Sequence, residues 1–162
     1  MQGQGRLIVD FARLDKGGEW YRGETAPDLL ELGESEFVIP VGGMVYDIRV
    51  EAVGNQLLSR GTVRQRLRCV CSRCAEDFET QVADDDFFCA MEINDQTDFV
   101  DLTADIREAI ILALPGYPVC DETCRGLCVG CGANLNKGAC ECVQKVEDSK
   151  WSALDALKPE VF

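Results

Sequence analysis

The chain has 162 residues, of which 29 are acidic, 16 are basic and ten are cysteine, and its net charge at pH 7 is −13. This length suits one domain, or one domain with a small appendage, and the absence of histidine excludes Ser-His-Asp and Cys-His catalytic arrangements. A chain with this much negative charge is not expected to bind nucleic acid nonspecifically through its overall electrostatic field. Any RNA contact therefore needs a local basic patch. Basic proteins are the simpler electrostatic expectation as partners.

Met1 to Asp10 shows no basic segment followed by an apolar run, and no stretch approaches the roughly 18 apolar residues of a membrane span. We therefore expect a cytoplasmic protein with no membrane segment. Cysteines in a reducing compartment are more often metal ligands or catalytic thiols than disulfides. The alternative, an extracellular disulfide scaffold, lacks an export signal.

In chain order, the pattern begins with a strand over 6–11. The segment 15–36, rich in glycine and acidic residues, is predicted to be a mobile connector or a partly ordered loop. Gly42-Gly43 predicts a bend. Apolar and polar residues then alternate over 44–53 and over 57–70, which predicts two neighbouring strands.

The segment from Cys71 to Cys74 predicts a tight turn, after which 78–83 returns as an antiparallel strand. The acidic run 84–86 is expected to be solvated, and 87–93 to form another strand. Together these segments predict an antiparallel meander with a pair of thiols at one hairpin tip.

Asp101 suits the N-cap of a helix over 102–114, whose apolar residues share one face, and Pro115-Gly116 ends that helix. A last short helix is expected over 149–157. Its buried side would carry Trp151, Leu154 and Leu157.

These elements predict an α+β fold in three parts. Residues 1–118 form an antiparallel sheet, with barrel-like closure as one option, and pack the helix 102–114 against it. Residues 119–143 form a cysteine-rich zinc knuckle or ribbon. Residues 144–162 form the C-terminal helix and a tail that pack on the same domain.

The cysteine spacing is the strongest functional signal. Two residues between Cys128 and Cys131 let one tight turn present both sulfurs to one ion, and Gly132 relieves the crowding of the backbone there. Cys140 and Cys142 need only one spacer, because alternate side chains of an extended strand share a face. These four thiols predict a zinc-ribbon-like site, with an iron–sulfur site and redox dithiols as alternatives.

A second site is predicted from the thiols of Cys71, Cys74, Cys120 and Cys124, which would tie the hairpin tip to the segment after the helix. Two other pairings stay open. Cys120, Cys124, Cys128 and Cys131 could share one ion and leave the other four thiols for the second, or the last six thiols could form a binuclear cluster. In each case we expect two structural Zn²⁺ ions per chain.

The remaining cysteines, Cys69 and Cys89, are expected to be ordinary small side chains, Cys69 buried on the strand face. A redox role for Cys71-Ser72-Arg73-Cys74 is less favoured, because such pairs usually open a helix in a thioredoxin-like order of strands and helices. Here both flanking segments are predicted strands.

Arginine recurs at every second residue over Arg64, Arg66 and Arg68, which places three guanidinium groups on one strand face. The functional interpretation is an RNA phosphate contact. The structural one is a solvated face paired across the sheet with glutamates such as Glu51, Glu76 or Glu79. The RNA-contact candidates are Arg64, Arg66, Arg68 and Arg73, with Arg125 and Lys137 on the knuckle as extensions.

In combination, these motifs resemble the YceD family, the bacterial and plastid large ribosomal RNA subunit accumulation proteins. Val129 departs from the family, which often has proline there. The resemblance covers most of the chain and rests on Cys71-Ser72-Arg73-Cys74, Asp101-Leu102, the helix end 108–115, Pro118-Val119-Cys120, the run 124–136, Cys140-Glu141-Cys142, and the tail residues 148–151 with Leu154 and Leu157.

The resemblance implies a noncatalytic factor of ribosome biogenesis in the bacterial cytoplasm. Such a factor would support accumulation or processing of large-subunit ribosomal RNA by binding the precursor RNA, a basic ribosomal protein, or both, and it would have no small-molecule substrate. The alternative is a zinc-stabilised protein-interaction module without direct RNA contact, and a thiol-redox enzyme is a distant third.

Overall fold

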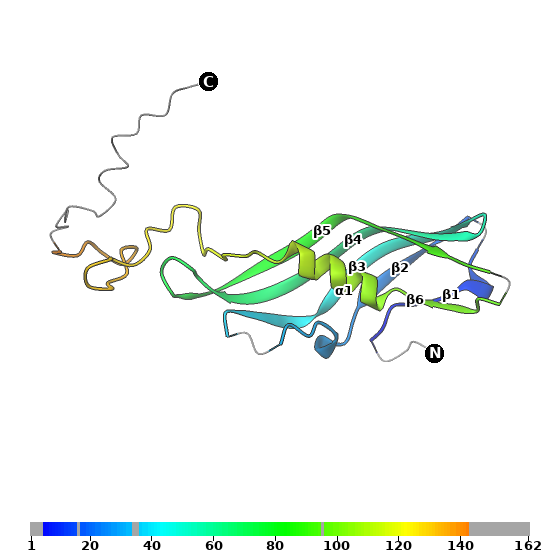
Figure 1. Ribbon diagram of the computed structural model, residues 1–162, viewed down its shortest axis with the longest axis horizontal. Helices are drawn as coiled ribbons and strands as arrows, with labels where there is room; N and C mark the ends of the chain where they lie inside the picture. The colour runs from blue at the N-terminus through cyan, green and yellow to red at the C-terminus, as the bar shows by residue number, and fades with distance from the viewer. Residues whose placement is uncertain (1–4, 16, 34–35, 95, 143–162) are drawn as a thin grey trace, which may run out of the picture.

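The computed structural model describes residues 5–15, 17–33, 36–94 and 96–142. Its largest element is a four-stranded antiparallel sheet, shown in Figure 1 running along the length of the molecule. The strands lie in the order β2 (Glu19–Glu24), β3 (Val38–Val53), β4 (Gln56–Val70) and β5 (Asp77–Glu92).

Shorter elements cover one face of this sheet. β1 (Ile8–Asp10) and β6 (Phe99–Asp101) pair antiparallel, and helix α1 (Thr103–Ala113) contacts β3, β4 and β5. Two single-turn 3-10 helices lie at Phe11–Arg13 and Pro27–Leu29. The combination confirms the α+β class.

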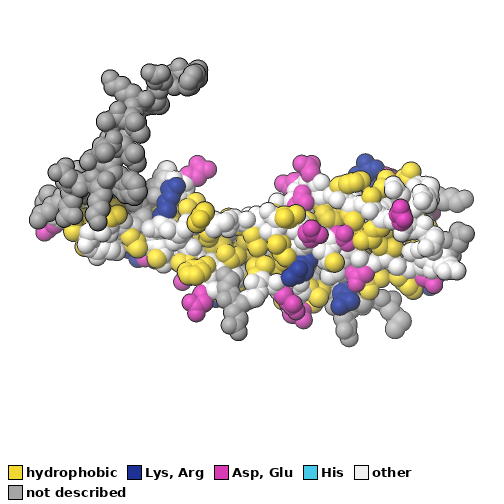
Figure 2. Space-filling model, viewed as in Figure 1, with side chains coloured by type: hydrophobic (Ala, Val, Ile, Leu, Met, Phe, Trp, Pro, Cys, Tyr) yellow, Lys and Arg dark blue, Asp and Glu magenta, His cyan; other side chains and the backbone are white. Residues whose placement is uncertain are grey.

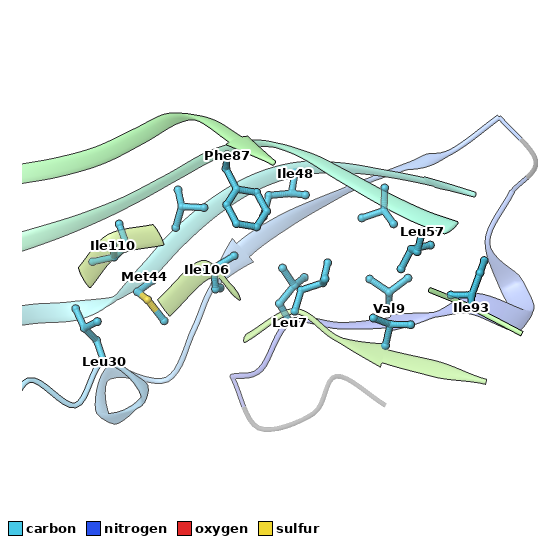
Figure 3. Packing of buried hydrophobic residues seen from close by; sticks show 14 residues of the cluster. Leu7, Val9, Leu30, Met44, Ile48, Leu57, Phe87, Ile93, Ile106 and Ile110 are labelled. Carbon is cyan, nitrogen blue, oxygen red and sulfur yellow. The ribbon is translucent and has the colours of Figure 1, made fainter. Parts of the chain in front are cut away.

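The alternating strands bury one face, as their sequence predicts. Along β4, the side chains of Leu57, Val63 and Leu67 are buried, whereas Arg64 and Arg66 between them are exposed. Leu57 and Val63 belong to the same core cluster as Ile106 and Ile110 of α1, which have no exposed surface. Figure 3 shows this core gathered between the sheet, the helix and the segment around Leu7 and Val9.

The sheet is open, so the barrel-like option is wrong. In the described part of the chain β2 and β5 each pair with a single neighbour and form the two edges. Closure is not needed to protect the core, because α1 and the β1–β6 pair already cover the apolar face.

The described residues of the segment 15–36 include regular secondary structure. They contain the edge strand β2, which pairs with Val45–Val50 of β3. Five of the six β2 side chains are exposed and Tyr21 is half-buried, so the strand lacks the apolar alternation that marks a buried face. The predicted bend at Gly42-Gly43 is an irregularity within β3, where a Cβ on Gly43 would lie 1.9 Å from the carbonyl oxygen of Thr25.

The two predicted strands 78–83 and 87–93 are one strand, β5. The acidic run between them stays in the strand, and the extra residue is absorbed by a register shift between Gly61 and Val63 of β4. Helix α1 begins at Thr103, so its N-cap residue is Leu102 and not the predicted Asp101. Asp101 ends β6, and its carboxylate accepts a hydrogen bond from the Thr103 amide at 2.9 Å.

The predicted helix over 149–157 lies outside the described residues. Within the described ranges, no helix has the length and apolar character needed to cross a membrane.

Candidate metal centres

The hairpin tip between β4 and β5 and the segment after α1 bring four thiols together. The Sγ atoms of Cys71 and Cys124 lie 3.8 Å apart and those of Cys74 and Cys120 lie 3.7 Å apart, and all four sulfurs lie within 4.8 Å of one another. Four sulfurs placed tetrahedrally at about 2.3 Å from one Zn²⁺ would be about 3.8 Å apart. This first thiol cluster therefore has the dimensions of a four-coordinate zinc site.

Backbone geometry at the hairpin tip aims amide groups at the sulfur of Cys71. The amides of Arg73 and Cys120 each donate to this Sγ at 3.4 Å, and Ala75 adopts a left-handed φ of 57° that closes the turn. Burial opposes ionisation of Cys71, but these amides and that of Cys74 outweigh it and lower its pKa to about 6. The cluster thus holds one thiol ready as a thiolate.

Hydrogen bonds and burial also shift the pKa values of other thiols in the first cluster. The side-chain amide of Asn136 donates to the Cys124 sulfur at 3.3 Å and is the main cause of a lowered pKa there. Desolvation, followed by hydrogen bonds with Cys124 and Cys71, raises the pKa of Cys120 to about 12. Neighbouring thiolates repel one another, and a divalent cation would remove that conflict.

A second thiol cluster forms within the knuckle. The sulfurs of Cys128, Cys131, Cys140 and Cys142 also lie within 4.8 Å of one another. The backbone amide of Cys131 is the main cause that lowers the pKa of Cys128 to about 6, and the amide of Gly130 donates to the same sulfur at 3.4 Å. A hydrogen bond with Cys131 is the main cause that raises the pKa of Cys142 to about 12.

The local backbone geometry of the knuckle explains the presence of two of its glycines. Gly132 has a φ of 73°, a left-handed conformation, and its amide donates to the Cys128 carbonyl at 2.8 Å. Gly126, with a φ of 74°, lies against the Arg73 carbonyl, where a Cβ would come within 3.0 Å. Both glycines let the chain turn tightly around the sulfurs.

The thiols therefore divide into Cys71, Cys74, Cys120 and Cys124 in one cluster and Cys128, Cys131, Cys140 and Cys142 in the other. This is the first of the three pairings considered from the sequence. Each cluster is a four-cysteine group that could hold a metal ion. Occupation by zinc stays a prediction, supported by the all-sulfur donor set and the tetrahedral dimensions.

Two of the predicted RNA-contact residues, Arg73 and Lys137, make contacts within the protein. The Arg73 guanidinium donates to the carbonyl oxygens of Glu122 at 3.0 Å and Cys124 at 3.3 Å. The Lys137 ammonium pairs with Glu76 at 2.6 Å, and this bond is the main cause of a lowered pKa for the Glu76 carboxyl. Both side chains join the hairpin tip to the knuckle.

Arg64, Arg66 and Arg68 lie on the sheet face opposite α1. Arg64 pairs with Asp85 at 3.1 Å, and Arg60 pairs with Glu51. For Arg66 and Arg68 the described residues provide no ion pair within 4.0 Å, although Glu79 lies directly across from Arg68 in the register. Arg125 on the knuckle is exposed, and its backbone amide donates to Asn136.

The structure adds residues to this face that the sequence pattern does not single out. Trp20 lies across from Arg49, Arg49 across from Arg60, and Arg60 across from Phe88. Directly paired residues share a face, so these four form one row across the sheet. The Trp20 and Phe88 side chains are 52% and 64% exposed. Trp20 escapes sequence analysis because β2 carries no periodic signal.

Cys69 and Cys89 stand apart from both clusters. Cys69 is buried on β4, as expected, and burial raises its pKa. The Cys89 thiol donates to the Asp105 carboxylate at 3.2 Å, and burial followed by this contact raises its pKa to about 12. Both thiols are held in the protonated, unreactive form.

Comparison with known proteins identifies the family. A family model described as large ribosomal RNA subunit accumulation protein YceD matches residues 84–158. The protein "Large ribosomal RNA subunit accumulation protein YCED homolog 1, chloroplastic" of Arabidopsis thaliana is 34% identical over 62 residues, which cover 38% of this chain and 19% of that protein. The chain thus matches a small part of that relative.

Relatives that align over most of their length come from mycobacteria. An uncharacterized protein of Mycobacterium leprae is 32% identical over 154 residues, covering 85% of this chain and 70% of the relative. One from Mycobacterium tuberculosis is 30% identical over 172 residues, covering 95% and 83%. No solved structure matches. The matched region contains α1 and six of the eight clustered thiols, and the chain belongs to the YceD family.

Proposed function

We propose that this protein is a noncatalytic factor in biogenesis of the large ribosomal subunit, which supports accumulation or processing of its ribosomal RNA by binding that RNA or a ribosomal protein. Membership of the YceD family is the observation that carries the proposal. The family's name describes accumulation of an RNA rather than a chemical conversion.

The two thiol clusters act as structural zinc sites in this proposal. Each would give the ion four sulfur ligands, and a closed set leaves no position for a reacting water. The first cluster joins residues that are 53 positions apart, Cys71 and Cys124, so an ion there would hold the knuckle against the hairpin tip. The metal would thus stabilise a surface and take no part in a reaction.

The sheet face opposite α1 is the proposed RNA contact. Arg66 and Arg68 are exposed and have no ion pair within the described ranges, so their guanidinium groups are available to phosphates. The row from Trp20 to Phe88 adds exposed aromatic rings beside arginines, a combination suited to unstacked bases. Arg64 and Arg125 extend this face, whereas Arg73 and Lys137 would contribute mainly by holding the knuckle.

A protein partner without direct RNA contact is the second candidate. It is favoured by the net charge of −13 and by the ion pairs of Arg22 with Asp47, Arg60 with Glu51 and Arg64 with Asp85, which neutralise part of the arginine face. The net negative charge of the molecule would attract a basic ribosomal protein.

Sedimentation and crosslinking separate the two candidates. The protein should cosediment with precursors of the large subunit in cell extracts, and a profile confined to the top of the gradient would overturn the ribosomal role. In R66A/R68A, crosslinking to ribosomal RNA should fall several-fold, while R13A, which removes an exposed arginine elsewhere, should leave it unchanged. Cosedimentation with unchanged crosslinking in R66A/R68A would support the protein partner.

A further inference from the structure

The edge strand β5 carries an unusual charge. Its 16 residues include six acidic side chains and no basic one. Figure 1 shows β5 along one rim of the sheet, and among the described strands only β4 pairs with it. Soluble proteins guard such edges with charge, and the same edge can accept a strand from a partner of opposite charge.

Two backbone hydrogen bonds at the end of β4 determine which β5 amides point outward. The Val70 amide donates to Phe37 beside β3, and the Cys71 amide donates to Glu76 on the β5 side. Even-numbered residues of β4 therefore face β3 and odd-numbered ones face β5. The register pairs Leu67 with Thr80 and Gln65 with Val82, so Thr80 and Val82 direct their backbone groups to β4.

The intervening residues of β5 direct their backbone groups away from the sheet. These are Glu79, Gln81 and Ala83, and no other described residue hydrogen-bonds to their amides or carbonyls. The open stretch ends at the acidic run, where the Asp86 amide donates to the Asp84 carboxylate at 3.0 Å and closes the edge locally. An added strand would therefore pair with Asp77–Ala83.

Side chains beside this edge specify the pattern of the added strand. On the face opposite α1, Asp77 and Glu79 are exposed and would oppose basic side chains. On the α1 face, Phe78 and Val82 are half-buried at the rim of the core and would be covered by apolar side chains. Figure 2 shows hydrophobic side chains gathered between α1 and the cysteine-rich end of the molecule.

We propose that the β5 edge over Asp77–Ala83 is a docking site for an extended protein segment that alternates basic and apolar residues and adds to the sheet as a further strand. The proposed ribosomal role enters only in the source of the segment, a basic ribosomal protein. The chemistry of the site stands on the open backbone edge, its charge and its half-buried apolar rim.

The test uses a synthetic peptide of alternating lysine and valine, about seven residues long, with the full chain. Q81P and Q81A lose the same side chain, but only Q81P also loses the outward amide. Proline at an outward-facing edge position removes no bond to β4. Q81A should bind the peptide as the unmodified protein does, and Q81P should bind it about tenfold more weakly.

Two further measurements keep the test decisive. Hydrogen exchange on the unmodified protein should show new protection of the Glu79, Gln81 and Ala83 amides with the peptide present, and this readout needs no variant to fold. Equal binding by Q81P and Q81A with no new protection would show attraction by charge alone and overturn the proposal. A single-stranded RNA that protects these amides in place of the peptide would overturn it too.

The outcome is independent of the sedimentation experiment. Loss of peptide binding in Q81P with no ribosomal cosedimentation would retain the docking edge and reject the ribosomal source of its occupant. Cosedimentation with ribosomal precursors, without peptide binding at the β5 edge, would retain the ribosomal role and reject the docking edge.

Discussion

At the scale of single residues, the arginines of this protein separate into different roles that their identity does not reveal. Arg73 spans from the hairpin tip to two carbonyls of the knuckle, whereas Arg68 has no ion pair in the described part of the chain. A hydrogen bond from a charged donor contributes more to stability than a hydrogen bond between neutral groups. Loss of the Arg73 side chain would also leave the carbonyl oxygens of Glu122 and Cys124 without this donor.

We therefore predict that R73A lowers the free energy of unfolding by about 1 kcal/mol and accelerates release of metal to a chromogenic chelator. R68A serves as the control, because an exposed side chain without partners should change stability by less than about 0.5 kcal/mol. Urea unfolding measures both. Equal stability of the two variants would contradict the bridging role of Arg73.

A glycine on β4 shows how closely the strands approach at the register shift. A Cβ on Gly61 would lie 2.1 Å from the carbonyl oxygen of Asp47 on β3, so the backbone itself would have to move. G61A should lower the free energy of unfolding by about 1–3 kcal/mol. G116A should leave the free energy of unfolding almost unchanged, because no atom lies within 4 Å of the added Cβ. Thermal unfolding of both variants measures the difference.

At the scale of elements, the hairpin tip and the knuckle share the first thiol cluster but not the second. Cys71 and Cys74 come from the hairpin, whereas all four thiols of the second cluster come from the knuckle. Removing a ligand from one cluster should therefore affect the two elements differently.

We predict that C124S and C131S each bind about one zinc ion instead of two, because a serine hydroxyl is not an anionic ligand at neutral pH. Only C124S should release the knuckle from the hairpin tip, and limited proteolysis should then cut the segment 114–119 faster than in C131S. Metal content shows whether each ligand is used. Equal cleavage in both variants would argue against the bridge between hairpin and knuckle.

At the scale of the whole molecule, metal binding should couple to pH. The thiols of Cys71 and Cys128 have pKa values lowered from 9.0 to about 6, so the stabilising thiolate contacts are complete above pH 9 and are lost as the pH falls through about 6. Protons compete with the metal over the same range.

Zinc should therefore stay bound at pH 7.5 and be released progressively below about pH 6, as measured by metal content after dialysis at each pH. Release of the metal should unfold the knuckle first, because the sheet retains its own core around Ile48, Val63 and Ile106. Loss of the whole sheet together with the metal would show that the clusters hold the entire fold.

Much of this architecture is predictable because it depends on local patterns. The alternation along 44–53 and 57–70 identifies the central strands, and the apolar face of 102–114 identifies α1 to within one residue at each end. The edge strand β2 and the continuity of β5 are not predictable in this way, since one is exposed on nearly every side and the other runs through three consecutive aspartates.

The sequence by itself determined the class of the fold, the family, and the set of eight thiols suited to metal. Tertiary structure decided which thiols share a cluster, that the sheet stays open, and that Arg73 and Lys137 join the hairpin tip to the knuckle. The physical reason is the sequence separation of the residues that interact. Spacing and periodicity act over a few residues, whereas the partners of Cys71 and Glu76 lie 53 and 61 positions away and are chosen by packing.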